Sequence, residues 1–443
     1  MRICLLILIF FISSQSPAQI THDVAINIIT YQPTGFRVDD TAQGQRVRRI
    51  FQKIKELGVD TLIFNFRAQM ITGVSSDIRP DVQSTQQADE ETLLKQTITY
   101  AKSLGFKIAF RPILLVVGPH GEFPYTDNST IWWHGNIRPT NVPEWFDHFF
   151  AYHQRYMRIA QEAEIAWYSI GAEMHSMTSG LGSRDPSWRF GFPALWVDFI
   201  SKARQILGPQ IQITYGANYT DQYVLEEGTK TWGGEFAQWT HDLTFTPQSA
   251  EEERHQNDMR ALWKSLDFVG LDYYRALGSS TTDYPKEYSR LIPLLNSYSQ
   301  NYAQNIDANL QAIDAALKMQ SALALQEVGY RSVEKCFVSP YLYEDDHTPI
   351  NYEHQAAAWD ALLMSLWIPE WSWLKGLGIW QVLLDDDSDQ IINGGFSPLG
   401  KDLTENVLRK YFLTHIEPPV KNEVQKVHAT HTNSVPAQSD LLK

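Results

Sequence analysis

Two glutamates that follow short apolar runs are the residues best placed to do chemistry. Glu173 ends the run at residues 167–172, and Glu327 ends the run at residues 322–326. Such runs are typical of buried strands, and the tip of a buried strand is an unusual place for an unpaired surface charge. Two carboxylates that face each other from rigid strands suit glycoside hydrolysis, in which one attacks the sugar and the other transfers a proton. On spacing alone, a pair of solvated surface charges remains the alternative.

Glycoside hydrolysis makes different demands on the two carboxylates. In a retaining enzyme they lie about 5–5.5 Å apart, and the nucleophile must stay ionised. The acid must hold its proton near neutral pH, which a partly apolar setting and a nearby like charge can arrange. Both glutamates therefore have to sit on one rigid framework.

Hydrophobic periodicity predicts that framework as an alternation of strands and helices. Apolar runs indicate strands at the two runs that end at the glutamates and at residues 25–31, 61–66, 107–117, 211–215, 268–274 and 377–384. Helical spacing indicates helices at residues 46–57, 91–104, 145–163, 195–207, 306–319, 354–366 and 406–412. Eight strands alternating with helices predict an α/β protein built as a closed (β/α)₈ TIM barrel. The glutamates then belong to its fourth and seventh strands.

The predicted connections after strands are longer than those after helices. The long ones follow strands three, five, six and seven, at residues 118–141, 217–261, 275–305 and 331–352. In this type of barrel the loops after strands form the catalytic face. The extra length thus lies where a substrate cleft would be built.

The two ends of the chain differ in composition from the predicted barrel. Arg2, the apolar residues 3–12 and the small residues Ser16 and Ala18 are typical of a signal peptide cleaved before Gln19. The apolar run is too short to span a bilayer. We expect a secreted or periplasmic protein with a signal peptide at 1–18, one catalytic domain at 19–415 and a polar, disordered tail at 416–443.

The charge of the chain argues against two classes of partner. The 443 residues are 43% hydrophobic and 20% charged, as in ordinary globular proteins, with a formal charge of −14. Loss of Arg2 with the signal leaves 36 basic against 51 acidic residues, or −15. This balance disfavours nucleic acid and anionic membranes and suits a neutral polysaccharide or oligosaccharide. Cys336 would be the only cysteine left, so no internal disulfide is expected, and the oligomeric state stays open.

Several short motifs occur in the order found in one known family. The runs IGAEM around Glu173 and LQEVGYRS around Glu327 resemble the acid/base and nucleophile strands of glycoside hydrolase family 113, in a large clan of retaining (β/α)₈ enzymes. Further resemblances are FRPIL at 110–114, WWHGNI at 132–137, VGLDYY at 269–274, GIWQ at 378–381 and GGFSPLGK at 394–401. The resemblance covers roughly residues 22–413, and it implies endo-acting hydrolysis of β-1,4-mannan.

The resemblance gives the two glutamates different roles. It implies that Glu173 is the acid/base and that Glu327 is the nucleophile. Tyr274 would donate a hydrogen bond to the nucleophile, and Trp380 would stack under the sugar at the cleavage point. The alternative for both aromatic residues is that they fill the mouth of the barrel.

Other residues on the predicted catalytic face are candidates for the cleft. Arg111 lies within the third strand, where a lone charge needs a partner, and that partner is either a catalytic carboxylate or a structural ion pair. Side chains on the long loops that would bind sugar hydroxyls or faces, or simply pack, are Trp133, His134, Asn218, Trp232 and Trp239.

One position departs from the pattern of the wider clan. Many clan members have Asn before the acid/base glutamate, where its amide contacts the sugar 2-hydroxyl, but this chain has Ala172.

The acidic run at 385–389 lacks the spacing of a helix-loop-helix calcium loop, so a solvated or sugar-contacting loop is favoured. Neither zinc spacing nor a phosphate-binding loop is present, and we expect no metal and no cofactor.

The sequence therefore predicts an exported retaining glycosidase, with β-1,4-mannan as the first choice of substrate. Another clan enzyme, such as a β-glucanase or β-mannosidase, is the nearest alternative. A non-catalytic glycan-binding barrel is the alternative from another class, and the presence of both glutamates favours the enzyme.

Overall fold

A computed structural model describes most of the chain. The described residues are 22–32, 34–182, 185–220, 233–285, 287–342, 347–386 and 394–414. The predicted signal peptide at 1–18, the predicted tail at 416–443 and the candidate Trp232 lie outside these residues.

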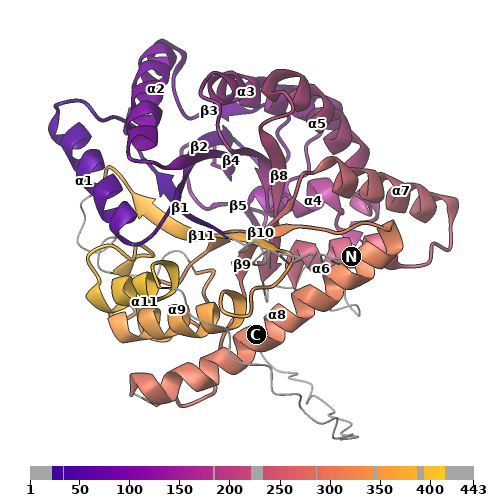
Figure 1. The fold of residues 1–443 in the computed structure, drawn as a ribbon. Helices are drawn as coiled ribbons and strands as arrows, with labels where there is room; N and C mark the ends of the chain where they lie inside the picture. The colour runs from indigo at the N-terminus through magenta and orange to yellow at the C-terminus, as the bar shows by residue number, and fades with distance from the viewer. Residues whose placement is uncertain are drawn as a thin grey trace, which may run out of the picture.

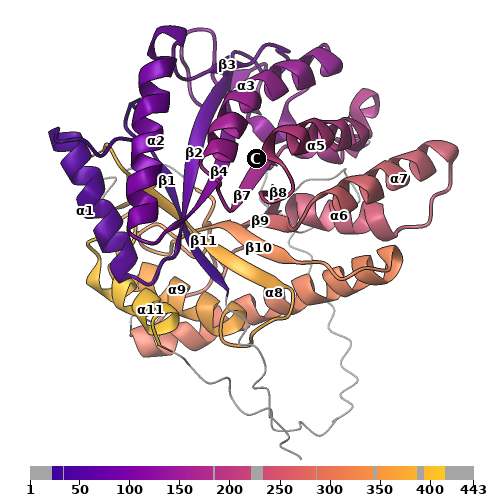
Figure 2. The ribbon, with the colours of Figure 1, turned by 45° about the horizontal axis from the view of Figure 1, so that its top comes forward.

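Eight parallel strands of the described chain close into a barrel with helices around it (Figures 1 and 2). The strand β1 pairs with β2 on one side and with β11 on the other, which closes the ring. The prediction of a (β/α)₈ barrel is therefore confirmed. Its strands are β1 (Asp23–Ile29), β2 (Thr61–Met70), β4 (Lys107–Val116), β7 (Trp167–Ala172), β8 (Gln212–Thr220), β9 (Val269–Tyr274), β10 (Leu323–Val328) and β11 (Leu374–Leu383).

The helices that connect the strands begin with capping side chains at several places. Thr41, Asn141, Ser249 and Asn351 each accept a hydrogen bond from a backbone N–H in the first turn that follows. Such caps satisfy donors that have no partner inside the helix. The helices are α1 (Ala42–Glu56), α2 (Gln87–Ser103), α3 (Val142–Glu162), α5 (Pro193–Leu207), α6 (Gly234–Thr244), α7 (Ala250–Ser265), α8 (Tyr288–Leu317), α9 (Tyr352–Leu366) and α11 (Asp402–Phe412).

Two predicted loops are largely helical. The segment 217–261 contains α6 and most of α7, and the segment 275–305 contains the first half of the 30-residue helix α8. Pro293 and many polar residues hide α8 in the sequence. Residues Leu291, Leu295, Ser299 and Ala303 are nevertheless buried at helical spacing, and α8 packs along α9. Tertiary packing here overrides weak local propensity.

The long loop after β4 is ordered by a small hairpin. Strands β5 (Tyr125–Asp127) and β6 (Thr130–Trp132) pair antiparallel, and the short helix η2 (His134–Asn136) follows. The short helix α4 (His175–Thr178) follows β7. None of the helices in the described part of the chain combines the length and apolar character needed to cross a lipid bilayer.

Candidate active site

Glu173 directly follows β7 in an uncommon backbone conformation. Its φ is +52°, in the left-handed region that residues with a side chain rarely occupy, and its N–H donates to Gly216 O at 2.8 Å. The turn that starts here leads into α4 and leaves the Glu173 side chain at the end of the barrel. Strain of this kind is typical of functional positions.

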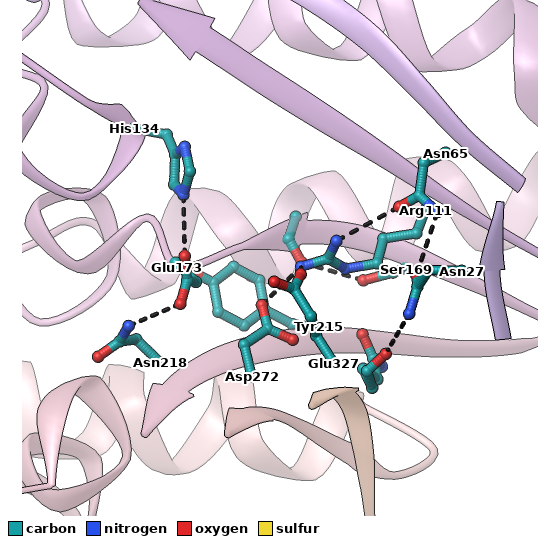
Figure 3. A network of polar contacts seen from close by, with 12 residues as sticks. Asn27, Asn65, Arg111, His134, Ser169, Glu173, Tyr215, Asn218, Asp272 and Glu327 are labelled. Carbon is teal, nitrogen blue, oxygen red and sulfur yellow. Dashed lines mark hydrogen bonds and ion pairs between the residues drawn. The ribbon is translucent and has the colours of Figure 1, made fainter. Parts of the chain in front are cut away.

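The Glu173 carboxylate is held between two side chains (Figure 3). Asn218 Nδ2, from β8, donates to Glu173 Oε1 at 2.6 Å. His134 Nε2, from η2, lies 3.2 Å from Glu173 Oε2. The Glu173 carboxylate therefore has one neutral neighbour, the Asn218 amide, and one neighbour that is charged only when protonated, the His134 ring.

Glu327, on β10, has different partners. Tyr274 donates its hydroxyl to Glu327 Oε1 at 2.5 Å, and Arg111 Nη2 lies 2.6 Å from Glu327 Oε2. Tyr274 is the last residue of β9, the strand beside β10. The neighbouring Tyr273 is buried, and its hydroxyl has no hydrogen-bond partner within the described residues.

Arg111 joins Glu327 to a second carboxylate inside the barrel. Its Nη2 also lies 2.6 Å from Asp272 Oδ2, and its Nη1 donates to Asn65 Oδ1 at 3.3 Å (Figure 3). The guanidinium is 3% exposed and stacks at 5.7 Å from the ring of Trp380. Arg111 is thus both the structural ion pair and the carboxylate partner that the sequence left as alternatives.

The electrostatics of the two glutamates differ from what their predicted roles require. Burial raises the pKa of Glu327, and the charge of Arg111 and the Tyr274 hydroxyl only partly oppose that rise. Burial also favours a higher pKa for Glu173, but the hydrogen bond and charge of His134 and the Asn218 amide outweigh it and lower that pKa. These contacts thus favour ionised Glu173, although the acid of the first step has to hold a proton. The sequence suggested that an apolar setting would keep the acid protonated. That suggestion did not include the contact of His134 with Glu173, which acts in the opposite direction.

Both glutamates line one open cavity of about 440 Å³. Its volume lies in the range of small-molecule sites, and its walls combine apolar surfaces with a few polar groups. The exposed side chains Ile131 and Tyr341 lie on two different loops at its edge. The cavity is lined by Ile131, Trp133, Glu173, Asn218, Thr220, Tyr274, Glu327, Tyr341, Trp380 and Phe396.

Most of the predicted site residues in the described part of the chain thus come together at this cavity. Arg111 and His134 do not line the cavity themselves, but each contacts a glutamate that does: Arg111 contacts Glu327, and His134 contacts Glu173. Trp239 lies in α6, is fully buried and donates its indole N–H to Thr178 Oγ1 at 3.3 Å. Trp239 is therefore a core residue and not a cleft residue, because α6 packs it against the barrel.

A third carboxyl group near the site was missed by sequence reasoning. Glu235, in α6, is fully buried and accepts hydrogen bonds from Tyr215 OH at 2.9 Å, from Asn218 N at 3.2 Å and from Thr178 Oγ1. Burial raises its pKa to about 8. Tyr215 OH also accepts from Met174 N at 2.7 Å, so Glu235 links the backbone directly after Glu173 to that of β8. Glu235 lies in the segment 217–261, which the sequence indicated to be a loop, so no sequence pattern pointed to a role for it.

The start of the acidic run at 385–389 has a structural role. Asp385 accepts hydrogen bonds from the backbone N–H groups of Tyr31 and Gln32, at 2.9 and 2.6 Å. It thus ties the end of β11 to the turn after β1, and residues 387–389 lie outside the described chain. Among the described residues, no cluster of three or more His, Cys, Asp or Glu side chains is arranged to hold a metal ion.

The fold and the site define the class of the protein. A closed (β/α)₈ barrel with two carboxylates in one cavity at the ends of β7 and β10 has the equipment for hydrolysis of glycosidic bonds, and the chain is a glycosidase. Residues 29–203 match the model of Glycoside Hydrolase Family 113. The resemblance to this family is therefore confirmed. A search of curated protein sequences finds no match.

Solved structures of related glycosidases share this fold. A family 113 β-mannanase from Alicyclobacillus acidocaldarius aligns over 89% of this chain and 98% of its own, with 14% identity and a TM-score of 0.59. Another family 113 β-1,4-mannanase aligns over 89% and 99%, with 17% identity and a TM-score of 0.58. A family 5 mannosidase from Rhizomucor miehei aligns over 88% and 92%, with 11% identity and a TM-score of 0.50.

Proposed function

We propose that the protein is a retaining endo-β-1,4-mannanase in which Glu327 is the nucleophile and Glu173 the acid/base. The observation that carries the proposal is the pair of carboxylates in one cavity, each with its own set of partners. The family 113 match and the names of the structural relatives, which are β-mannanases, support the choice of substrate.

In the first step Glu327 attacks the anomeric carbon of the bound sugar. Arg111 and the Tyr274 hydroxyl each contact one of its oxygens, so they favour the ionised carboxylate that attack requires. The bond to the departing sugar breaks as Glu173 gives its proton to the leaving oxygen. A covalent glycosyl–Glu327 ester results.

In the second step water attacks the same carbon from the face that the leaving sugar has vacated. Glu173, now ionised, takes a proton from that water, and Glu327 departs as a carboxylate. Two inversions at the anomeric carbon give net retention. Trp380, at the cavity wall, supplies a flat apolar surface for the sugar ring.

Asn218 is our candidate for the amide contact that Ala172 cannot make. It lines the cavity and touches Glu173, so its amide lies beside the acid/base as the Asn of other clan members does. In this chain the amide would come from β8 and not from the end of β7.

The contacts in the site bear differently on the two alternatives, which are another β-glycosidase and a non-catalytic glycan-binding barrel. A β-glucanase or an exo-acting β-mannosidase would use the same two carboxylates, so the substrate decides between them. A glycan-binding barrel has no need of a tyrosine and an arginine on one carboxylate and a histidine and an amide on another. These contacts favour the enzyme.

The test combines a substrate screen with two variants. We expect hydrolysis of mannan and manno-oligosaccharides in a panel that also holds glucomannan, cellulose and xylan oligosaccharides, with product sizes that show internal cleavage. Glu327→Ala and Glu173→Ala should each lower kcat by at least about 10³-fold with the fold retained. Azide should rescue Glu173→Ala and give a β-glycosyl azide. Near-normal activity of either variant would remove the assignment.

We also propose that residues 1–18 direct export and are removed. The charged start, the apolar segment and the small residues before Gln19 support this proposal. Sequencing of the mature N-terminus from an exporting host should begin at Gln19, and an intact Met1 would contradict export by this route.

A further inference from the structure

The contact between His134 and Glu173 has no counterpart in the two-carboxylate mechanism. Double displacement needs a nucleophile and an acid/base, and a histidine on the acid/base is an addition to that minimum. His134 Nε2 lies 3.2 Å from Glu173 Oε2, with side chains only 20% and 15% exposed. The loop after β4 brings this histidine to the site, as its hairpin β5–β6 leads directly into η2.

The other groups that face Glu173 act differently from His134. Asn218 donates to Glu173 Oε1 but cannot change its charge. Arg111 attracts the ionised form from a greater distance and is committed to Asp272 and Glu327. Groups whose own ionisation the Glu173 charge opposes are Glu235 on α6, Asp272 and Tyr274 on β9, and Glu327 on β10. Among the described side chains in direct contact with the Glu173 carboxylate, His134 is thus the one that can carry a positive charge.

We propose that His134 is a positioning residue that favours the ionised form of Glu173 and so shifts the working pH range of both chemical steps toward acid. The inference rests on the proposed function, because that function gives Glu173 the proton transfers. The first step needs protonated Glu173, and the second step needs ionised Glu173. A protonated His134 opposes the first requirement and supports the second, in accord with the lowered pKa of Glu173.

The kinetic test uses His134→Gln, which keeps a hydrogen-bond donor and removes the titratable charge. With manno-oligosaccharides, whose leaving sugar needs a proton, the alkaline limb of kcat/KM should move up by about 1 pH unit. With an aryl β-mannoside that has a good leaving group, the second step limits kcat, and the acid limb of kcat should also move up. Both shifts report one change, because removal of the cation makes Glu173 harder to ionise.

A matched control and a second variant separate this role from a structural one. His120→Gln changes an exposed histidine of the same loop. The acid and alkaline limbs of its pH profiles should coincide with those of the wild type. Should Gln disturb the loop, His134→Asn serves as the second variant. Activity that falls in the His134 variants while both limbs stay in place would overturn the proposal.

A direct titration makes the test independent of turnover. In protein labelled with ¹³C at glutamate carboxyls, the Glu173 signal is identified by its loss in Glu173→Gln. It should titrate at higher pH in His134→Gln than in the wild type. An unchanged titration would overturn the role of His134. A shifted titration in a protein that cleaves no glycan would support that role while removing the proposed function.

Discussion

Tyr274 and Arg111 place Glu327 by contacts of different kinds. The tyrosine holds one carboxylate oxygen by a neutral donor at 2.5 Å, and the arginine holds the other by charge at 2.6 Å. Both contacts favour ionised Glu327, whereas burial and the charge of Glu173 oppose it. The reactivity of the nucleophile therefore depends on both donors remaining in place.

Replacement of Tyr274 tests this balance at the level of one residue. Tyr274→Phe removes a hydrogen bond to a charged group, which contributes about 1.5–3 kcal/mol, so kcat/KM should fall by roughly 10- to 100-fold. The pKa of Glu327 should rise, because the hydroxyl lowers it in the intact site. Since the nucleophile must be ionised, the acid limb of kcat/KM should move to higher pH.

Tyr273→Phe is the matched control for that experiment. It removes a buried hydroxyl from the adjacent residue, which has no hydrogen-bond partner in the described part of the chain. We expect its pH profile to overlay that of the wild type. A Tyr274→Phe profile that also overlays the wild type would show that the 2.5 Å contact does not tune Glu327.

At the level of elements, helix α6 supports the acid/base from behind. It places Glu235 where its carboxyl accepts from Asn218 N on β8 and from Tyr215, whose hydroxyl accepts from Met174 N after β7. Together with the Thr178 hydroxyl, these two donors favour the ionised form of Glu235. Burial outweighs all three donors and raises the pKa of Glu235 to about 8. The tips of two neighbouring strands are thus tied to one buried acid.

The buried acid should make stability depend on pH in a defined direction. The folded chain holds the Glu235 proton up to about pH 8, whereas the unfolded chain releases it near its ordinary pKa of about 4.3. Between these values the folded state binds more protons, so a rise in pH lowers the free energy of unfolding. Glu235→Gln removes this contribution, whose slope is at most about 1.4 kcal/mol per pH unit.

Urea unfolding of the wild type and Glu235→Gln from pH 5 to pH 8 measures this effect. The stability of the variant relative to the wild type should increase steadily as pH rises. Glu253→Gln, on an exposed position of α7, should track the wild type at every pH. A constant difference between Glu235→Gln and the wild type would show that Glu235 is already ionised when folded.

At the level of the whole molecule, closure of the barrel brings distant segments into one site. Strand β1 lies between β2 and β11, and a polar chain crosses the barrel interior from it. Asn65 donates to Asn27 Oδ1 at 3.1 Å, and Arg111 donates to Asn65 and reaches Glu327. The nucleophile is thereby connected to the strand that closes the ring.

The sequence predicted the framework better than the surroundings of the site. Strands such as those ending at Glu173 and Glu327 are buried on both faces, so they read as continuous apolar runs. Helix α8 was only half predicted, because Pro293 and its polar residues conceal a buried face that depends on α9. Glu235 and the approach of His134 to Glu173 were not readable, because both depend on how loop segments pack.

The central claim, that Glu327 forms a covalent intermediate, is tested most directly by trapping it. A 2-deoxy-2-fluoro-β-mannosyl fluoride should react with the enzyme but release the sugar slowly, because the fluorine destabilises the positively charged transition states of both steps. Mass spectrometry of proteolytic peptides should then find the added sugar on the peptide that contains Glu327, and Glu327→Gln should remain unlabelled. A sugar attached to Glu173, or hydrolysis of the reagent with inversion and no adduct, would contradict the account.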